Sequence, residues 1–308
     1  MTGDKRFPIT RVSRQELHLS RYEKCLETSP PGAPVYAWPW FLDIMAGKWE
    51  VLVWDDYRYV MPVAFRRKWG ISYVYQPVFV QQLGIYPAAP PDETRAFFTL
   101  LASLYPYIHF PSGYGAEEAE AAGFTIMEHH TRRLRLGTGY PSLAARFGDY
   151  ITQNLKKATL SQITVSREFQ PAVFFELQKV SRKIPVPGDA WNRFRRLMEA
   201  TLSDGRGLLL VARDPGKEAV AAAFFILWRE TAYYMAVCSG PRGRALRAGF
   251  ALLDTFFRDH GHLPITFDFE GSSVEGVDRF FAAFGAESSP YYLFRLNRLP
   301  WPIRRIKQ

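Results

Sequence analysis

The sequence has few cysteines and no long apolar run, and both absences exclude classes of protein. Its two cysteines, Cys25 and Cys238, lie far apart and outside any CxxC or Cys/His spacing, so neither a disulfide framework nor a metal site is indicated. The longest apolar run, residues 219–228, has ten residues, whereas a membrane-spanning helix needs about 20. The N-terminus has no apolar segment of the signal-peptide kind. We therefore expect a cytoplasmic protein with no transmembrane segment and no metal.

Acidic residues are outnumbered, at 30 against 39 lysines and arginines, which leaves a formal net charge of +9. This excess favours an anionic partner, such as a nucleotide, a phosphorylated precursor, tRNA or a membrane surface. The basic residues are spread along the whole chain, and no recognised RNA motif is present, which disfavours a dedicated RNA-binding module. Charge by itself is equally consistent with a basic protein that has no such partner.

The remaining composition is that of a globular protein with ample core. Hydrophobic residues make up 47% of the chain, aromatic residues 16% and charged residues 22%. A length of 308 residues suits two domains of roughly 150 residues each.

A repeated plan organises the chain into two halves. Residues 49–80 and 207–240 each contain three runs rich in β-branched and aromatic residues, which predicts a three-stranded meander in each half. A helix, a strand, a short helix and a final strand follow each meander, at residues 92–103, 107–110, 116–123 and 131–136 in the first half and at 245–260, 265–269, 274–284 and 291–296 in the second. Val51 and Phe110 are 59 residues apart and Leu209 and Phe267 are 58, which supports a duplication.

The repeat predicts an α/β (α+β) fold of two domains in tandem, each a mixed, mostly antiparallel sheet flanked by helices. The Gly/Pro stretch at residues 137–141 is the expected boundary, between an N-terminal domain of residues 1–138 and a C-terminal domain of residues 139–308. Residues 142–160 and 171–201 indicate helices before the second meander.

Two stretches of the second half carry a family resemblance. One is QNLKKA at residues 153–158, and the other is FDFEG at residues 267–271 with VDRFFAAFG at 277–285. With the duplicated plan they resemble the GNAT acyltransferase fold in tandem, in particular the FemAB-type family, whose corresponding helix reads R/K-N-x-R/K-K-A. The first half is similar through residues 38–40 and 61–62. The resemblance implies transfer of an acyl or aminoacyl group from acyl-CoA or aminoacyl-tRNA to an amine by direct attack, with no tightly bound cofactor and a peptidoglycan-precursor-like or other anionic substrate.

The segment after the second meander is the expected donor site. GNAT enzymes that bind coenzyme A usually show R/Q-x-x-G-x-G/A there, and this chain instead has SGPRGRALRAG at residues 239–249, in a different register. Arg242, Gly243, Arg244 and Arg247 lie where a loop enters a helix, and free amides and the helix dipole favour phosphate at such a point. We expect these residues to bind the donor, and the alternative is a solvated basic helix face.

Asp268 and Glu270 are the candidate catalytic residues. They alternate with Phe267 and Phe269, so in a strand the two carboxylates share one face and the two rings share the other. A carboxylate at a strand end can take the proton of an attacking amine. The alternative is that these acids pair with nearby arginines or cap the next helix at residues 271–273.

Further residues are expected to line a substrate cleft. The lysines would meet a phosphorylated substrate and the aromatic residues would line the cleft; they are Lys156, Lys157, Tyr73, Tyr75, Trp38 and Tyr291. The rival reading is a non-catalytic tandem GNAT-like protein that binds a phosphorylated anion or a partner, and the irregular loop at residues 239–249 favours it.

Overall fold

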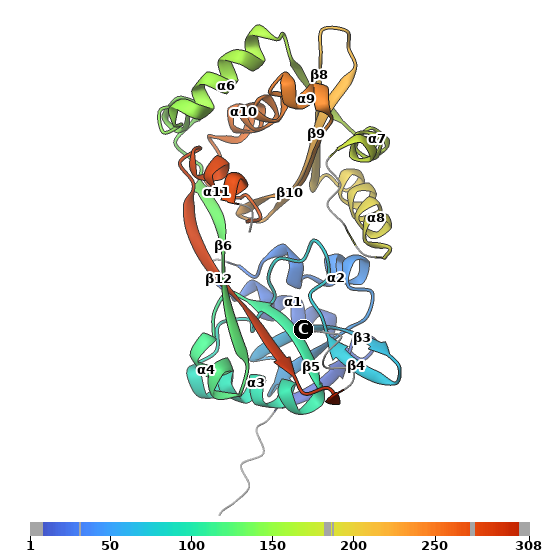
Figure 1. Ribbon diagram of the computed structural model, residues 1–308. Coiled ribbons are helices and arrows are strands. Elements are labelled where there is room, and N and C mark those ends of the chain that lie inside the picture. The colour runs from blue at the N-terminus through green and yellow to red at the C-terminus, as the bar shows by residue number, and fades with distance from the viewer. Residues whose placement is uncertain (1–8, 31, 182–185, 187, 272–274, 302–308) are drawn as a thin grey trace, which may run out of the picture. The chain divides into compact units, whose positions relative to one another are not determined.

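The computed structural model describes residues 9–30, 32–181, 186, 188–271 and 275–301. The chain divides into two compact units: unit 1 comprises residues 1–129 and 290–308, and unit 2 comprises residues 130–289. The chain passes from one unit to the other within β6 (Thr125–Arg135) and again within β12 (Glu287–Asn297), as can be followed in Figure 1. The predicted boundary between residues 138 and 139 concerns the repeated sequence plan and stays a prediction. Among the described residues, no helix is both long enough and apolar enough to span a bilayer.

Unit 1 is built on an antiparallel sheet with the order β1-β2-β3-β4. Its strands are β1 (Ile9–Ser13), β2 (Trp49–Trp54), β3 (Tyr59–Lys68) and β4 (Ile71–Val74), and β5 (Tyr107–Ser112) follows later in the chain. Its helices are α1 (Leu19–Glu27), η1 (Val35–Ala37), α2 (Pro39–Met45), α3 (Pro91–Leu104) and α4 (Ala116–Ala121). The predicted meander, helix, strand and helix are thus all present, and β1 is an additional strand that the sequence did not indicate.

Unit 2 contains the strand order β6-β11-β10-β9-β8-β7, in which the pairs are antiparallel apart from β10 with β11. Its own strands are β7 (Thr164–Glu168), β8 (Gly207–Arg213), β9 (Ala219–Trp228), β10 (Thr231–Ser239) and β11 (Thr266–Asp268). Its helices are α5 (Tyr140–Ala144), α6 (Asp149–Leu160), α7 (Ala172–Val180), α8 (Ala190–Ser203), α9 (Pro241–Ala245), α10 (Ala248–His260) and α11 (Glu275–Ala282). The helices expected at 142–160 and 171–201 each divide into two, and the N-terminus predicted for the last helix at Val274 lies outside the described residues.

The central strand of unit 2 is buried on both faces. Helices α6 and α10 cover one face of the sheet and α7 and α8 the other (Figure 1). Phe225 of β9 stacks on Phe256 of α10, with ring centroids 4.5 Å apart, while its neighbour Phe224 meets Phe194 of α8 at 5.7 Å. A strand covered on both sides has no polar face. This explains why residues 219–228 form the longest apolar run of the sequence.

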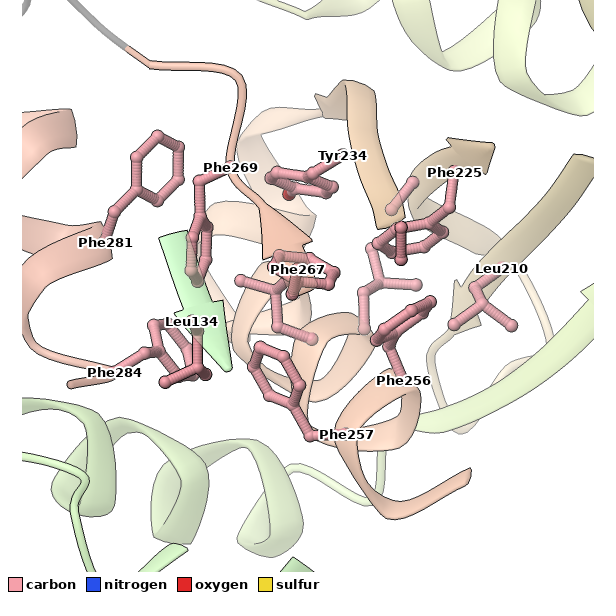
Figure 2. Close-up of a cluster of buried hydrophobic side chains, with 14 of the residues drawn as sticks. Leu134, Leu210, Phe225, Tyr234, Phe256, Phe257, Phe267, Phe269, Phe281 and Phe284 are labelled. Carbon is pink, nitrogen blue, oxygen red and sulfur yellow. The ribbon is translucent and has the colours of Figure 1, made fainter. Parts of the chain in front are cut away.

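A cluster of aromatic side chains holds β11 against the helices of unit 2 (Figure 2). Phe267 and Phe269 are fully buried, with their ring centroids 4.7 Å apart, and Phe269 also meets Phe281 of α11 at 4.7 Å. Phe257 of α10 reaches Phe267 at 5.0 Å. The two rings of the FDFEG stretch thus pack together in the core, although Phe269 lies just beyond the end of β11. Their burial fixes the position of the residues between and after them.

The final strands of the two halves are exchanged. β6, from the first half of the sequence, pairs with β11, so that Arg135 lies opposite Thr266. β12, from the second half, pairs with β5, so that Tyr292 lies opposite Ser112. Each half of the sequence therefore supplies a strand that pairs with a strand of the other half, and β5 and β12 continue the sheet of unit 2 beyond β6. Alternation patterns within one strand do not specify this pairing.

Candidate functional site

The parallel strands β10 and β11 are paired over a short distance only. Thr231 to Tyr233 lie opposite Thr266 to Asp268, and β11 then ends while β10 continues to Ser239. In the same region β10 carries a bulge between Tyr233 and Ala236, where it advances one residue more than β9. Among the described strands, none pairs with the β11 side of β10 beyond this point. A sheet edge with backbone groups directed outward is thus present inside unit 2.

The orientation of the amides along this edge follows from one hydrogen bond. The Ser239 N–H donates to Ser181 Oγ at 2.8 Å, so it faces away from β9. Peptide directions alternate along a strand, so the N–H of Val237, two residues earlier, faces the same side. The Val237 side chain is 48% exposed, which makes this part of the strand accessible. The bulge and the Ser181 contact thus single out Val237.

The strand leads into a tight loop and then into α10. Gly243 of α9 is buried, and a Cβ atom at this position would lie 2.1 Å from the carbonyl oxygen of Val220 on β9. Only glycine permits this approach of α9 to the strand. Arg247 precedes α10 with a left-handed φ of 61°, a conformation that a residue with a long side chain rarely adopts. The predicted glycine and arginine therefore fix the backbone at the start of α10.

The three arginines of this loop have different partners. Arg242 Nε lies 2.5 Å from Oδ2 of Asp214, a side chain with 1% exposure. Arg244 Nη1 donates to the carbonyl oxygen of Ser239 at 2.6 Å. Arg247 Nε is buried and makes no hydrogen bond within the described residues. A buried charged donor without an acceptor is costly, and an anion beside it would satisfy it. Arg247 is thus the best placed of the three to hold a phosphate.

Both carboxylate oxygens of Asp268 accept hydrogen bonds from other groups of the protein. Oδ1 accepts hydrogen bonds from Thr131 Oγ1 at 2.6 Å and from the Glu270 N–H at 2.9 Å, and Oδ2 accepts one from Arg133 Nε at 2.8 Å. The residue is 2% exposed. These contacts join β11 to β6 and to the turn that follows, which supports a structural role. The catalytic role expected for Asp268 stays a prediction.

Glu270 does not continue the strand. Its φ is 65°, in the left-handed region, because β11 has ended and the Glu270 N–H turns back to Asp268. The expectation that the two carboxylates share one strand face is therefore wrong. Glu270 is half-buried and follows directly on the point where β10 and β11 separate, so of the two acids it is the one placed to accept a proton at this edge.

The two predicted lysines lie on another part of unit 2. Both are exposed on α6. Lys156 lines a pocket of about 540 Å³ between α5, α6 and α10, together with Tyr140, Phe147 and Arg258. None of the residues that line this pocket belongs to β10, β11 or α9. The structure thus does not bring Lys156 and Lys157 together with the β10 edge within this unit.

The predicted aromatic residues belong to unit 1. Trp38 is buried, and its Nε1 donates to the carbonyl oxygen of Ala33 at 3.3 Å. The hydroxyl of Tyr75 donates to the carbonyl oxygen of Ala46 at 2.9 Å, and the Tyr73 ring lies 6.4 Å from the Tyr75 ring. These contacts position the side chains in the core and on the sheet of unit 1.

Tyr291, the last predicted cleft residue, lies on β12 in unit 1. Its ring stacks on His129 of β6, with centroids 5.5 Å apart. The substrate-binding role of all four aromatic residues stays a prediction.

The cysteine of β10 is unsuited to covalent catalysis. Burial raises the pKa of the Cys238 thiol to about 12, and Sγ lies 3.4 Å from the carbonyl oxygen of Phe174. A nucleophilic cysteine needs an accessible thiolate. Cys238 therefore offers no nucleophile at this site.

Comparison with known proteins identifies this architecture. Residues 172–281 match the acetyltransferase (GNAT) domain family, and they include β8 to β11 and α7 to α10. No curated protein matches the chain. Among solved structures, FemX has a TM-score of 0.65 at 14% identity, over 96% of this chain and 99% of FemX.

Two further structures share the fold over nearly the whole chain. A tandem GNAT protein from the clavulanic acid biosynthesis pathway has a TM-score of 0.53 at 12% identity, over 95% of this chain and 99% of that one. The C-terminal domain of a putative lysylphosphatidylglycerol synthetase from Agrobacterium fabrum has 0.55 at 13% identity, over 94% of each chain. The predicted tandem GNAT-like fold is thus confirmed, and residues 172–281 are similar to the GNAT domain family.

Proposed function

We propose that the protein is an acyl or aminoacyl transferase whose donor binds at the β10 edge and the start of α10. The observation that carries this proposal is the separation of β10 from β11 beside a bulge, followed by Gly243 and Arg247 at the entry to a 13-residue helix. An activated carbonyl can lie along the open edge while the phosphates of its carrier reach the helix N-terminus. The family match covers all of these elements.

The proposed reaction is direct attack of an amine on the donor carbonyl. The new C–N bond forms as the carbonyl π electrons move to oxygen, where the Val237 N–H stabilises the oxyanion. Glu270 accepts the proton of the attacking amine. The intermediate then collapses and expels the thiolate of coenzyme A or the ribose oxygen of tRNA, which takes up a proton. No side-chain nucleophile is required, in agreement with the buried Cys238.

The choice of donor follows from which carrier Arg247 and α10 accept. Acyl-CoA and aminoacyl-tRNA both join an activated carbonyl to a carrier that bears phosphates, so Arg247 and the start of α10 could serve either one. Of the structural neighbours, the tandem GNAT protein was determined without AcCoA, and another is the C-terminal domain of a putative lysylphosphatidylglycerol synthetase. The acceptor that we propose is an amine on an anionic molecule, such as a peptidoglycan precursor, because the chain carries a net charge of +9.

The partners of two arginines favour a second candidate function. Arg242 and Arg244 are already bound to Asp214 and Ser239, which leaves Arg247 as the cation of the loop with an unmet donor. A tandem GNAT-like protein that binds a phosphorylated anion without turning over a donor would need only one such arginine. The two functions differ in whether a bound donor is consumed.

The proposal is tested by donor binding and turnover in the same protein. Melting temperature is measured with acetyl-CoA, a long-chain acyl-CoA, free coenzyme A and a mixture of aminoacyl-tRNAs, because a ligand that binds the native state raises it. Arg247→Gln should lower the affinity for the donor that binds the wild type by about tenfold or more. Arg279→Gln, which removes an exposed arginine of α11 paired with Glu275, should leave that affinity unchanged.

The outcomes separate the two functions. Loss of donor binding in Arg247→Gln together with donor cleavage by the wild type supports the transferase. Binding of free coenzyme A without cleavage of any thioester or aminoacyl ester, in the presence of mixed amines, supports the non-catalytic protein. Equal affinity in the wild type and Arg247→Gln excludes the start of α10 as the donor site.

A further inference from the structure

The hairpin between β3 and β4 has an unusual residue in its turn. Lys68 lies opposite Ile71, so Trp69 and Gly70 form a two-residue loop, with φ angles of 51° and 79°. Positive φ at both positions is the type I′ turn, which favours Asn, Asp or Gly at the first position. A tryptophan there holds a bulky side chain in the left-handed region, where an L residue is strained. Strain of this kind is a reason to look for a function.

The strained tryptophan is also exposed. Trp69 keeps 70% of its surface accessible, and the ammonium of Lys68 lies 4.5 Å from the centre of its ring. Folding therefore gains little from this side chain, either through burial or through backbone conformation. Within Figure 1 the hairpin extends from the body of unit 1, with the turn at its end. The turn thus presents an indole and a cation to a partner outside the folded chain.

The charge around the turn has one sign. Between Asp56 and Asp92 the sequence contains no acidic residue, and three of the four basic residues in that interval are Arg66, Arg67 and Lys68 at the end of the hairpin. The guanidinium of Arg66 lies over the ring of Tyr75 at 4.2 Å, and Arg67 Nε donates to the carbonyl oxygen of Gly70 at 3.2 Å. Both contacts hold the arginines at the hairpin while their side chains remain exposed. The partner of this tip is therefore anionic.

We propose that the tip formed by Arg66, Arg67, Lys68 and Trp69 docks the protein on an anionic membrane surface. Indole rings favour the interface between lipid headgroups and acyl chains, and neighbouring lysines and arginines bind anionic headgroups. A single ring on a projecting turn can insert into the headgroup region of one bilayer leaflet. Single-stranded nucleic acid is held instead in a basic groove with several stacking rings, and Tyr73 and Tyr75 next to this turn are half-buried.

The proposal is tested by sedimentation with lipid vesicles at low salt, using the full chain. The protein should bind vesicles that contain phosphatidylglycerol and phosphatidylcholine, and bind vesicles of phosphatidylcholine alone much more weakly. Trp69→Asn should lower the partition coefficient by about tenfold, and Arg67→Gln with Lys68→Gln should lower it by about fivefold for each charge. Control variants are Phe169→Ala, which removes another exposed aromatic ring, and Lys48→Gln with Arg95→Gln, which removes two exposed cations of unit 1.

Trp69→Asn has a second readout that distinguishes function from damage. The variant creates an Asn-Gly turn, so its melting temperature should rise by a few degrees while vesicle binding falls. Weaker binding with a lower melting temperature would mean that the variant had only damaged the fold, and would overturn the proposal. Binding equal to that of the control variants would do the same. Loss of affinity for a tRNA mixture with vesicle binding unchanged would assign the tip to nucleic acid instead.

Discussion

The helices that follow the two meanders differ most at their N-termini. In unit 2, α10 has no acidic residue in its first turn and is preceded by the arginine loop that ends at Arg247. In unit 1, α3 follows Pro90 and carries Asp92 and Glu93 in its first turn. Acidic side chains stabilise a helix at this end, and they also repel an anion from it. The phosphate site that we propose at α10 therefore has no equivalent at α3.

The edges of the last meander strands, β10 in unit 2 and β4 in unit 1, also differ in whether they are open. In unit 2, β10 continues past the end of β11 with a bulge and an accessible edge. In unit 1, β4 ends at Val74, and the chain then returns to β5 through a parallel bridge between Leu83 and Ser112. Gln81 and Gln82 fill this region as buried side chains that bond to one another at 2.8 Å. A repeat can thus keep its architecture while the groups that would hold a donor are retained in one copy.

The largest effect that we predict concerns the buried carboxylate of each unit. Asp268 binds Thr131 and Arg133, and Glu50 of β2 accepts hydrogen bonds from Arg11 at 2.7 Å and from the Tyr105 hydroxyl at 2.6 Å. Removing one partner of a buried pair costs about 3–5 kcal/mol. Here the carboxylates are buried but Arg11 and Arg133 are 47% and 43% exposed, so Asp268→Asn and Glu50→Gln should each lower the free energy of unfolding, measured with urea, by about 3–4 kcal/mol.

The two variants also separate structure from catalysis. If Asp268 is structural, the kcat of donor cleavage at a temperature well below the melting point should be unchanged in both variants. A fall in kcat for Asp268→Asn alone, with its stability intact, would make Asp268 the base and would restore the pair of acids that the sequence indicated.

A smaller loss of stability is expected at the loop of unit 2. Gly243→Ala places a Cβ atom against the carbonyl oxygen of Val220, so we expect about 3 kcal/mol of destabilisation from overpacking. Gly249→Ala is the matched control in the first turn of α10, because a Cβ atom there meets nothing within 4 Å; it should raise stability by about 0.5–1 kcal/mol. Urea titration of the two variants checks the difference, and equal stability would show that α9 does not require a glycine.

Much of the fold could be predicted because each element is specified locally. Alternating runs indicated the meander strands, and the matched spacings of the two halves indicated the strand of the FDFEG stretch in the repeated plan. The bulge at Tyr233, the exchange of β6 with β12 and the contacts of Asp268 with Thr131 and Arg133 depend on strand register and on residues more than 130 positions away. For that reason the loop at residues 239–249 could be singled out from its arginines and glycine, whereas the Val237 amide and the left-handed Glu270 could not.

Copying the acidic first turn of α3 into α10 tests the contrast between the helix N-termini. Gly249→Glu fits without a clash and places a carboxylate beside the proposed phosphate site. Donor affinity should fall by about tenfold to thirtyfold, which is about 1.4–2 kcal/mol, while stability stays the same or rises slightly. Titration with the active donor measures this. The reverse change, Asp92→Asn with Glu93→Gln, should give unit 1 no donor affinity, because its strand edge is closed; donor binding gained there would contradict that interpretation.

The smallest predicted effect concerns how the last short helix of each half is held. Helix α4 follows Gly115, where a Cβ atom would lie 2.9 Å from Phe98 of α3, whereas α11 is joined to β6 by Arg132, whose Nε and Nη2 donate to Asp278 at 2.7 Å and 2.6 Å. These hydrogen bonds lower the pKa of Asp278 below its usual value. The folded state therefore favours the ionised carboxylate, so the stabilisation is present above about pH 4 and is lost as the pH falls through the lowered pKa.

Both side chains of this pair are partly exposed, so solvent screening limits its contribution to about 0.5–1 kcal/mol. The difference in unfolding free energy between the wild type and Asp278→Asn should have that size at pH 7 and approach zero near pH 2. A difference that does not change with pH would mean that Asp278 acts through packing alone. The attachment of α11 would then be apolar, through Phe281 against Phe269 after β11, and the contrast with the packed attachment of α4 would disappear.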